Sequence, residues 1–247
     1  MAGSQTVIEI RPLSALAEFS EAVTLEQGIW GFADFDVVPL PLFVVARETG
    51  GQTFGAYEAN RMIGFCLALA GLKPDGRPFL HSHMLAVLPS HRDAGVGRSL
   101  KLQQRADALA RGIELIEWTF DPLELKNAFF NIERLGAIVR RYHENEYGAT
   151  SSPLHSALPT DRCVAEWWIG SPRVQSVLAG ESIERQVDER IAVPVEIERL
   201  RREDPGRARA IQSANAERFQ RSFSRGLAVI GFERAESEGV YLLGRPV

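Results

Sequence analysis

One stretch of the chain joins an apolar segment to an amphipathic one through a glycine-rich turn, and it constrains the fold more than any other stretch. Residues 80–87 alternate in a way that predicts a β-strand, and the apolar residues of 95–111 recur at helical spacing. Arg92, Gly95 and Gly97 lie between the two. Glycine has no Cβ, and the first N–H groups of a helix lack intrahelical partners. The turn is therefore suited to hold a phosphate group.

The run Arg92-x-x-Gly95-x-Gly97, placed between a strand and a helix, resembles the acyl-CoA pyrophosphate loop of the GNAT superfamily of N-acyltransferases. The resemblance implies acyl-CoA as cosubstrate, with the main chain at the end of the strand pairing with its pantetheine arm. The cofactor-binding residues expected on this basis are Leu85, Ala86, Val87, Arg92, Asp93, Ala94, Gly95, Val96, Gly97, Arg98 and Asn127. A Rossmann or P-loop interpretation fits less well, because the glycine and lysine patterns of those folds are missing.

The patterns along the chain predict alternating strands and helices. Before the glycine-rich turn we expect a strand at 7–11, a helix ending near residue 30, a helical segment in 39–49 and a hairpin at 53–58 and 62–69. After the strand and helix described above, we expect a strand at 114–120, a helix at 125–135, and strands at 137–143 and 163–169. This order is that of the GNAT superfamily, so the resemblance covers about residues 7–169. It implies an α/β (α+β) fold with a mixed, mostly antiparallel twisted sheet flanked by helices.

The residues that follow show a strand-helix-hairpin pattern of their own. We expect a linker at 171–184, a strand at 189–194, a helix at 196–219 and a hairpin at 227–232 and 240–243. The chain is therefore predicted to contain an acyltransferase core at 1–170 and a C-terminal α/β extension at 171–247, which otherwise completes the same domain. The sequence leaves three roles open for the extension: lengthening the sheet, covering the acceptor site or forming a homodimer contact.

Composition indicates an ordinary soluble protein. Hydrophobic residues make up 45% of the chain, charged residues 24%, and the net charge is −4, which gives no reason to expect nucleic acid or membrane as a partner. Cys66 and Cys163 have no metal-ligand spacing and are expected to be buried free thiols. The N-terminus lacks the charged and apolar regions of a leader, so we expect a cytoplasmic protein.

Two histidines precede the glycine-rich turn. His81 and His83 are expected on one face of the strand at 80–87, with Ser82 on the other. An imidazole titrates near neutrality and can deprotonate an ammonium directly or through water, so both are candidate catalytic residues. Histidines that only satisfy local hydrogen bonds are an equally good interpretation. Zinc binding is not expected, because no third ligand lies at useful spacing.

The resemblance also implies a general acid that this chain lacks. The superfamily often has a tyrosine four residues before the glycine that ends the helix after the fifth strand, and Ile132 stands at that position before Gly136. Isoleucine cannot donate a proton. Asn131, Tyr142 or Tyr147 could act in its place or hold a water. For Tyr142 the alternative is a strand aromatic packed on the sheet.

Other polar and aromatic residues are candidates for the acceptor site. Glu117 is placed so that its carboxylate could take a proton from an amine, and Asp121 could orient that amine or form a plain turn before Pro122. Arg162 could clamp a carboxylate or pair with its neighbour, and Trp30 could line the pocket or lie in the core.

Together these residues predict an enzyme that transfers an acetyl or succinyl group from CoA to the amine of a small molecule, such as an amino acid or a related metabolite. The runs at 80–84, 118–123, 127–137 and 159–162 resemble one branch of predicted acyltransferases. Some relatives in that branch are associated with N-succinylation of amino acids, which implies succinyl-CoA as an alternative donor. The competing hypothesis is a non-catalytic acyl-CoA-binding or sensor module, and Ile132 is its main support. No metal is expected.

Overall fold

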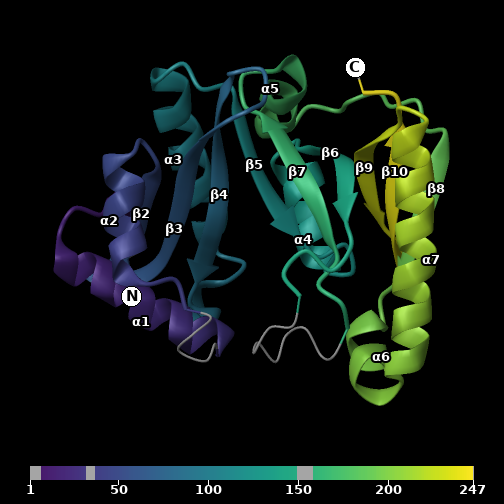
Figure 1. Cartoon of the computed structure of the whole chain (residues 1–247), viewed down its shortest axis with the longest axis horizontal. Coiled ribbons are helices and arrows are strands. Elements are labelled where there is room, and N and C mark those ends of the chain that lie inside the picture. Colours follow the sequence, from purple (N-terminus) through teal and green to yellow (C-terminus); the bar gives the residue numbers. More distant parts are fainter. Residues whose placement is uncertain (1–6, 32–36, 149–157, 247) are drawn as a thin grey trace, which may run out of the picture. The chain divides into compact units, whose positions relative to one another are not determined.

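The computed structural model describes residues 7–31, 37–148 and 158–246 (Figure 1). These residues divide into two compact units. The N-terminal unit extends to Ile116 and the C-terminal unit begins at Glu117, so the boundary falls within strand β5 (Leu115–Phe120). Each unit consists of strands and helices, and most strand pairs are antiparallel, which confirms the predicted mixed α/β class.

The N-terminal unit contains four strands in chain order. β1 (Ile8–Pro12), β2 (Gln52–Glu58), β3 (Arg61–Leu72) and β4 (Pro78–Val87) pair antiparallel with their neighbours. The β2–β3 hairpin turns at Ala59 and Asn60, both with positive φ (46° and 67°). Left-handed residues in a two-residue turn match the twist of the flanking strands. The predicted hairpin is present, and Arg61, expected in the connection, pairs with Glu58 as the first residue of β3.

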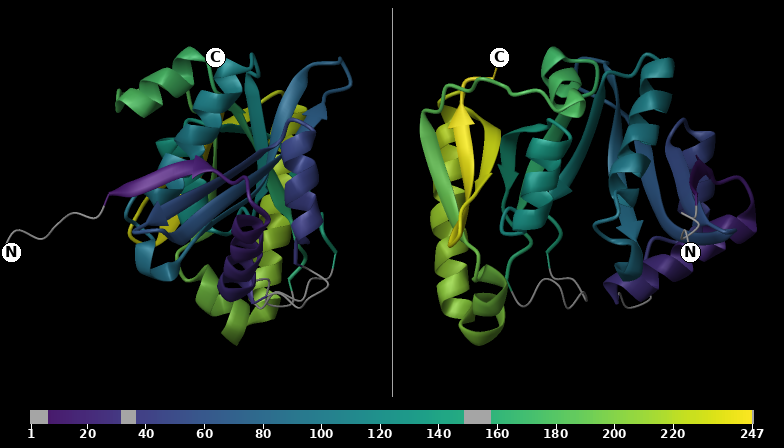
Figure 2. Two further views of the ribbon diagram at one scale, coloured as in Figure 1. Left: turned by 90° about the vertical axis from the view of Figure 1, so that its left-hand side faces the viewer. Right: turned by 180° about the vertical axis from the view of Figure 1, so that it is seen from behind.

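Helices cover both faces of this sheet (Figure 2). Helix α3 (Val96–Ala110) packs on one face, and helices α1 (Leu16–Trp30) and α2 (Leu40–Glu48) pack on the other. The cluster under α3 contains Phe54, Ala56, Ile63, Cys66, Val96 and Leu100. The cluster under α1 and α2 includes Phe19, Phe43, Tyr57, Phe65, Leu67, Met84 and Ala86. Each large apolar side chain buried in this way contributes about 1.5–3 kcal/mol, so α3 is anchored at its first turn by Val96 and Leu100.

The strands of the C-terminal unit have the order β5-β7-β6-β9-β10-β8. Their bounds are β6 (Ile138–His143), β7 (Arg162–Trp168), β8 (Glu189–Pro194), β9 (Ala228–Arg234) and β10 (Glu238–Gly244). β10 pairs antiparallel with both β9 and β8, and β9 meets β6 at Val139 and Val229. The C-terminal extension therefore lengthens the sheet of this unit, one of the three roles left open by the sequence.

Helices α4 (Leu125–Phe129), α5 (Pro172–Ala179), α6 (Ile197–Glu203) and α7 (Pro205–Ser224) complete the C-terminal unit. α4 continues directly into a π-helical turn, η3 (Phe130–Arg134). α7 packs against β6 and β8. The ring of its Phe219 stacks on Tyr142 of β6 (centroids 5.6 Å apart) and meets Tyr241 of β10 edge-on (5.1 Å). None of the helices in the described residues combines the length and the apolar run that a membrane crossing requires.

Two predicted elements differ from the structure. The segment 171–184 was expected to be a linker, but α5 occupies its first half, because the Ser171 hydroxyl caps the helix by accepting from the N–H of Val174 and Gly180 ends it at φ 78°. The helix expected at 196–219 is two helices. Asp204 ends α6 and caps α7, so Pro205 takes the first position of α7, where proline needs no donor.

Candidate functional site

The chain between β4 and α3 makes a tight, exposed turn. Residues 89–91 form one 3₁₀ turn, η2 (Pro89–His91), after which Asp93 and Gly95 both adopt positive φ (62° and 82°). Arg92, Asp93, Ala94 and Gly95 are exposed, whereas Val96 is buried in the core. The predicted glycine-rich turn is therefore present. Its side chains are exposed to solvent, and the buried Val96 anchors the start of α3 in the core.

Helix α3 begins without a side-chain cap. Its N-cap residue is Gly95, and within the described part of the chain no side chain accepts from its first N–H groups. These donors have no intrahelical partner, and the helix dipole adds positive potential at the same place. An anion that reaches this end would be bound by main-chain groups, as at other phosphate-binding helix N-termini. The geometry suits a phosphate-containing ligand.

The two glycines of the turn serve different purposes. A Cβ on Gly95 would meet nothing within 4 Å, but φ of 82° is strained for any residue with a side chain. A Cβ on Gly97 would lie in ordinary contact with Leu85 (3.4 Å) and Val87 (3.8 Å). The backbone conformation therefore requires glycine at position 95, whereas a Cβ at position 97 would fit at an ordinary contact distance.

Basic side chains lie beside the turn. Arg92 is exposed, and its Nε donates to the carbonyl of Val87 at 3.4 Å, which brings the guanidinium back towards the end of β4. His91 Nε2 lies 3.2 Å from a carboxylate oxygen of Glu58. Arg98, in the first turn of α3, is half-buried. Arg92 is thus placed to add a positive charge next to the free N–H groups.

A β-bulge in β4 changes which face of the sheet the candidate side chains lie on. Ser82 pairs with Ala68 and Met84 with Leu67, which leaves His83 without a partner position on β3. Bulges re-aim side chains in this way. The rings of His81 and His83 have centroids 6.0 Å apart, and Ser82 faces α3. Beyond the bulge Leu85 and Val87 pack towards α3, and Ala86 belongs to the cluster under α1 and α2, where Trp30 also packs.

Sequence analysis missed a buried polar group behind the turn. Lys101 of α3 is 3% exposed, and its Nζ donates to Ser82 Oγ at 2.7 Å, while Ser82 donates to Gln104 Oε1 at 3.0 Å. Burial lowers the pKa of Lys101 to about 7. Lys101 and Gln104, spaced at i and i+3, interrupt the apolar face of α3. This interruption is the sequence signal that could have revealed the buried polar group. The network ties α3 to β4 through polar contacts.

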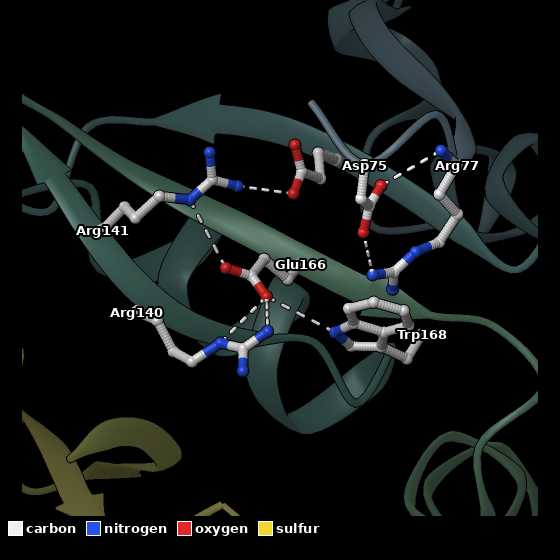
Figure 3. Close-up of polar contacts among 7 residues, drawn as sticks. Asp75, Arg77, Arg140, Arg141, Glu166 and Trp168 are labelled. Carbon is white, nitrogen blue, oxygen red and sulfur yellow. Dashed lines mark hydrogen bonds and ion pairs between the residues drawn. The ribbon is translucent and has the colours of Figure 1, made fainter. Parts of the chain in front are cut away.

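In the C-terminal unit two buried glutamates are paired with arginines (Figure 3). Glu117 of β5 accepts from Arg141, and Glu166 of β7 forms ion pairs with both Arg140 and Arg141. The indole N–H of Trp168 also donates to Glu166, at 3.4 Å. Glu117, a candidate proton acceptor, is therefore a buried carboxylate that is already paired with a partly exposed arginine.

Tyr142 and Arg162 lie in a neighbouring polar cluster. The hydroxyl of Tyr142 donates to Asp161 Oδ2 at 2.7 Å, and burial together with this bond raises the pKa of Tyr142. Arg162, at the start of β7, places its guanidinium 5.3 Å from the ring of Tyr147. Tyr147 in turn shares a hydrogen bond of 2.7 Å with Thr119. Tyr142 therefore has its proton engaged and its ring stacked, as the packed-aromatic interpretation expects.

Asp121 forms both a turn and a buried ion pair. Its Oδ1 accepts from the N–H of Leu123 at 2.8 Å, and its Oδ2 lies 2.6 Å from the guanidinium of Arg201. Arg201 also binds Glu124 at 2.9 Å. These contacts fasten α6 to the turn after β5, and they occupy both oxygens of Asp121.

The helix expected at 125–135 carries the remaining candidates. Asn127 is exposed on α4, and Asn131 is buried in η3, where its carbonyl accepts from Ala137 at 3.0 Å. Ile132 is fully buried. Among the described residues no group of three His, Cys, Asp or Glu side chains is arranged to hold a metal.

Comparison with known proteins connects this geometry to one family. Residues 17–136 match the model of the acetyltransferase (GNAT) family. Solved structures with a similar fold include the ribosomal-protein-S18-alanine N-acetyltransferase from Escherichia coli, with 18% identity, a TM-score of 0.53 and coverage of 67% of this chain and 96% of that one. No curated protein matches.

Two further structures contain CoA or a CoA derivative. The yncA protein from Salmonella typhimurium, solved with its cofactor acetyl-CoA, is 14% identical over 67% of this chain and 97% of its own, with a TM-score of 0.53. Naa50 from Arabidopsis thaliana, in complex with the bisubstrate analogue CoA-Ac-MVNAL, is 15% identical over 64% of this chain and 97% of its own, with a TM-score of 0.50. At these identities the likeness establishes the fold.

Proposed function

Since residues 17–136 form a GNAT acetyltransferase domain, we propose that the chain is an acyl-CoA-dependent N-acyltransferase that acetylates the amine of a small molecule. The observation that carries the proposal is the uncapped N-terminus of α3, which follows the left-handed Gly95 in an exposed turn. Residues 92–98 would hold the pyrophosphate, with Leu85, Ala86 and Val87 completing the cofactor site. An amino acid or related metabolite is the proposed acceptor, and residues 1–170 are the proposed catalytic core.

The turn supports anion binding through conformation, so a matched pair of glycine variants tests it. Gly95→Val and Gly112→Val each place a side chain at a positive φ (82° and 71°) with nothing within 4 Å of the new Cβ. The backbone strain is comparable, about 1–2 kcal/mol, at the two ends of the same helix. Only Gly95→Val distorts the proposed pyrophosphate site.

We expect Gly95→Val to weaken CoA binding at least about tenfold in isothermal titration calorimetry, which corresponds to the loss of one charge-assisted hydrogen bond. Gly112→Val should bind CoA as the wild type does. Equal affinity in the two variants, with similar thermal unfolding, would reject this turn as the CoA site.

Transfer requires a neutral amine, and His83 is the proposed proton acceptor. The thioester of acyl-CoA supplies the activated acyl group, and the acceptor must lose a proton before it attacks. His83 is exposed on β4, and desolvation of its ring by the adjacent protein lowers its pKa, which favours the neutral imidazole at physiological pH. His81 lies beside it, with the ring centroids 6.0 Å apart. The other candidates, Glu117, Asn131 and Tyr142, lie in buried or hydrogen-bonded positions.

This role gives the pH profile a definite sign. Only the neutral imidazole accepts a proton, so kcat/KM should fall as the pH drops through the pKa of His83, which lies below the usual 6.5. His83→Gln should lower kcat by about 100-fold or more and remove this limb of the profile. His143→Gln is the control, because His143 pairs with Glu146 in the C-terminal unit. An unchanged profile in His83→Gln would transfer the role to another group.

The alternative is an acyl-CoA-binding or sensor module without catalysis. The buried Ile132 favours it, because no hydroxyl stands at the position where the resemblance implies a general acid. Incubation with acetyl-CoA, a panel of amines and a thiol reagent separates the two. Thiol release that depends on the amine supports the enzyme, whereas CoA binding without release supports the module.

Succinyl-CoA is the alternative donor, with Arg162 as the residue that would bind its extra carboxylate. A guanidinium forms two parallel hydrogen bonds to a carboxylate, worth about 1.5–3 kcal/mol or roughly ten- to a hundredfold in kcat/KM. Arg162→Leu should then reduce kcat/KM for succinyl-CoA and spare acetyl-CoA. Equal losses with both donors would exclude Arg162 as the donor-selecting residue.

A further inference from the structure

A cavity of about 200 Å³ lies within the C-terminal unit, among residues to which the proposed acyltransferase assigns no role. β6 and β9 contribute Ile138 and Ile230 to its lining. The charged part of the lining contains three arginines, Arg173 of α5, Arg185 and Arg245. A small cavity with apolar walls and several cationic groups has the character of a ligand site.

Arg173 is fixed by the main chain. Its Nε donates to the carbonyl of Gly136 at 3.0 Å, and an Nη donates to the carbonyl of Ile230 at 2.7 Å. Burial and the nearby charge of Arg185 lower the pKa of Arg173 to about 10, so the guanidinium remains charged at neutral pH. Carbonyl groups accept its hydrogen bonds but do not neutralise it. Two cations lie close together here, and the carboxylate of Glu133 offsets only one of their charges.

One nitrogen of the Arg185 guanidinium is paired with a carboxylate, whereas its Nε is not hydrogen-bonded to any described residue. An Nη lies 2.9 Å from Glu133 Oε2, while the other oxygen of Glu133 accepts from the N–H of Phe232 at 2.7 Å. The Nε of Arg185 is buried and has no hydrogen-bond partner among the described residues. A buried donor left in this state destabilises a protein by about 1–3 kcal/mol. An acceptor inside the cavity would satisfy it.

The segment that carries Arg185 lies close against β9 and β10. A Cβ on Gly231 would lie 3.1 Å from the Arg185 side chain, and a Cβ on Gly244 would lie 2.1 Å from the carbonyl oxygen of Gln186. The N–H of Asp188 donates to the carbonyl of Leu243 at 2.8 Å. Glycines at these two positions therefore let the segment approach closely enough to form one wall of the cavity.

The side chains of this segment alternate in exposure. Glu184, Gln186 and Asp188 are exposed, and Arg185 between them is half-buried. The two carboxylates of the lining are thus hydrated, whereas Arg185 lies on the inner side. Arg245 is exposed and adds a positive charge at the rim. The inner lining is cationic.

We propose that this cavity is a binding site for a small anion with a carboxylate or phosphate group, held by Arg185 and Arg173 and closed by Arg245. Planar guanidinium groups match the paired oxygens of either group. The site is independent of the proposed acyltransferase activity.

The test is calorimetric titration of the full chain with inorganic phosphate and, separately, with succinate, at constant ionic strength. Arg185→Gln should weaken binding at least about tenfold, because it removes a charged donor. Arg245→Gln, at the exposed rim just after β10, should weaken it several-fold. Arg190→Gln removes the same charge from an exposed pair with Glu233 and should leave affinity unchanged. Gly95→Val should also retain binding, which separates this site from the turn before α3.

Binding of phosphate alone or of succinate alone identifies the group that the site selects, and both results support the proposal. Failure of both probes to bind up to roughly 10 mM, the weak limit of specific recognition, would overturn it. Equal affinity in wild type and Arg185→Gln, with Arg185→Gln folded by circular dichroism, would overturn it as well. So would equal losses in Arg185→Gln and Arg190→Gln.

Discussion

Replacing Lys101 by methionine should change how stability depends on pH. Lys101 is 3% exposed, and burial lowers the pKa of its ammonium from 10.5 to about 7. The unfolded chain therefore binds a proton at this residue between about pH 7 and 10.5, whereas the folded chain does not. Because the unfolded state binds more protons in this range, the free energy of unfolding rises with pH.

The magnitude follows from the two pKa values. The slope approaches 1.4 kcal/mol per pH unit, so between about pH 7.5 and pH 9.5 the contribution of Lys101 grows by about 2–3 kcal/mol. Methionine fills a similar volume and does not titrate. Relative to the wild type, Lys101→Met should thus lose about 2–3 kcal/mol of pH-dependent stabilisation over this range.

Urea unfolding followed by circular dichroism at several pH values measures the difference. Other titrating groups are shared by the two proteins and cancel. Lys126→Met is the control, because Lys126 is exposed on α4 and the variant makes the same change outside the core. If Lys101→Met and wild type change in parallel with pH, within about 0.5 kcal/mol, the buried lysine is not the source of the slope and the argument is refuted.

Two further predictions concern buried groups. Arg201→Met leaves two carboxylates without their buried partner and should lower the free energy of unfolding by about 3–5 kcal/mol in a urea titration. Arg199→Met breaks only an exposed ion pair and should lower it by less than about 1 kcal/mol in the same titration. Burial raises the pKa of Cys66 to about 12 and that of Cys163 well above its usual value, so neither thiol should react with a thiol reagent at mildly alkaline pH until the protein is unfolded. Rapid labelling of the folded protein would contradict that burial.

The strand, turn and helix around Gly95 could be predicted because their signals are local. Apolar periodicity and a glycine that must be left-handed both lie within a few residues. The segment after Ser171 carries equally local signals, a serine cap, Pro172 at the first helical position and Gly180 at the end, but its polar composition favoured a linker. Composition was a poorer guide there than the cap.

Candidate site residues were harder to predict because their partners are distant in sequence. Asp121 and Arg201 are 80 residues apart, so no spacing rule reveals that the carboxylate is already bound. The facing of Ser82 depends on a bulge at His83, which is set by register with β3. Alternation along one strand predicts faces only where the pairing is regular.

The narrow connection between β6 and β9 has a consequence for motion. Within the described residues these strands are paired at one position, Val139 opposite Val229, whereas β9, β10 and β8 are joined by long ladders. The three C-terminal strands form a block with few main-chain hydrogen bonds to β6, although α7 packs on both sides of this junction. Such blocks open as cooperative units, and amides at their borders exchange with deuterium before those inside. The cavity lined by Arg173, Arg185 and Arg245 lies across the border between β6 and this block, because Arg173 donates to the carbonyls of Gly136 and Ile230. An anion bound there would hold the two sides together.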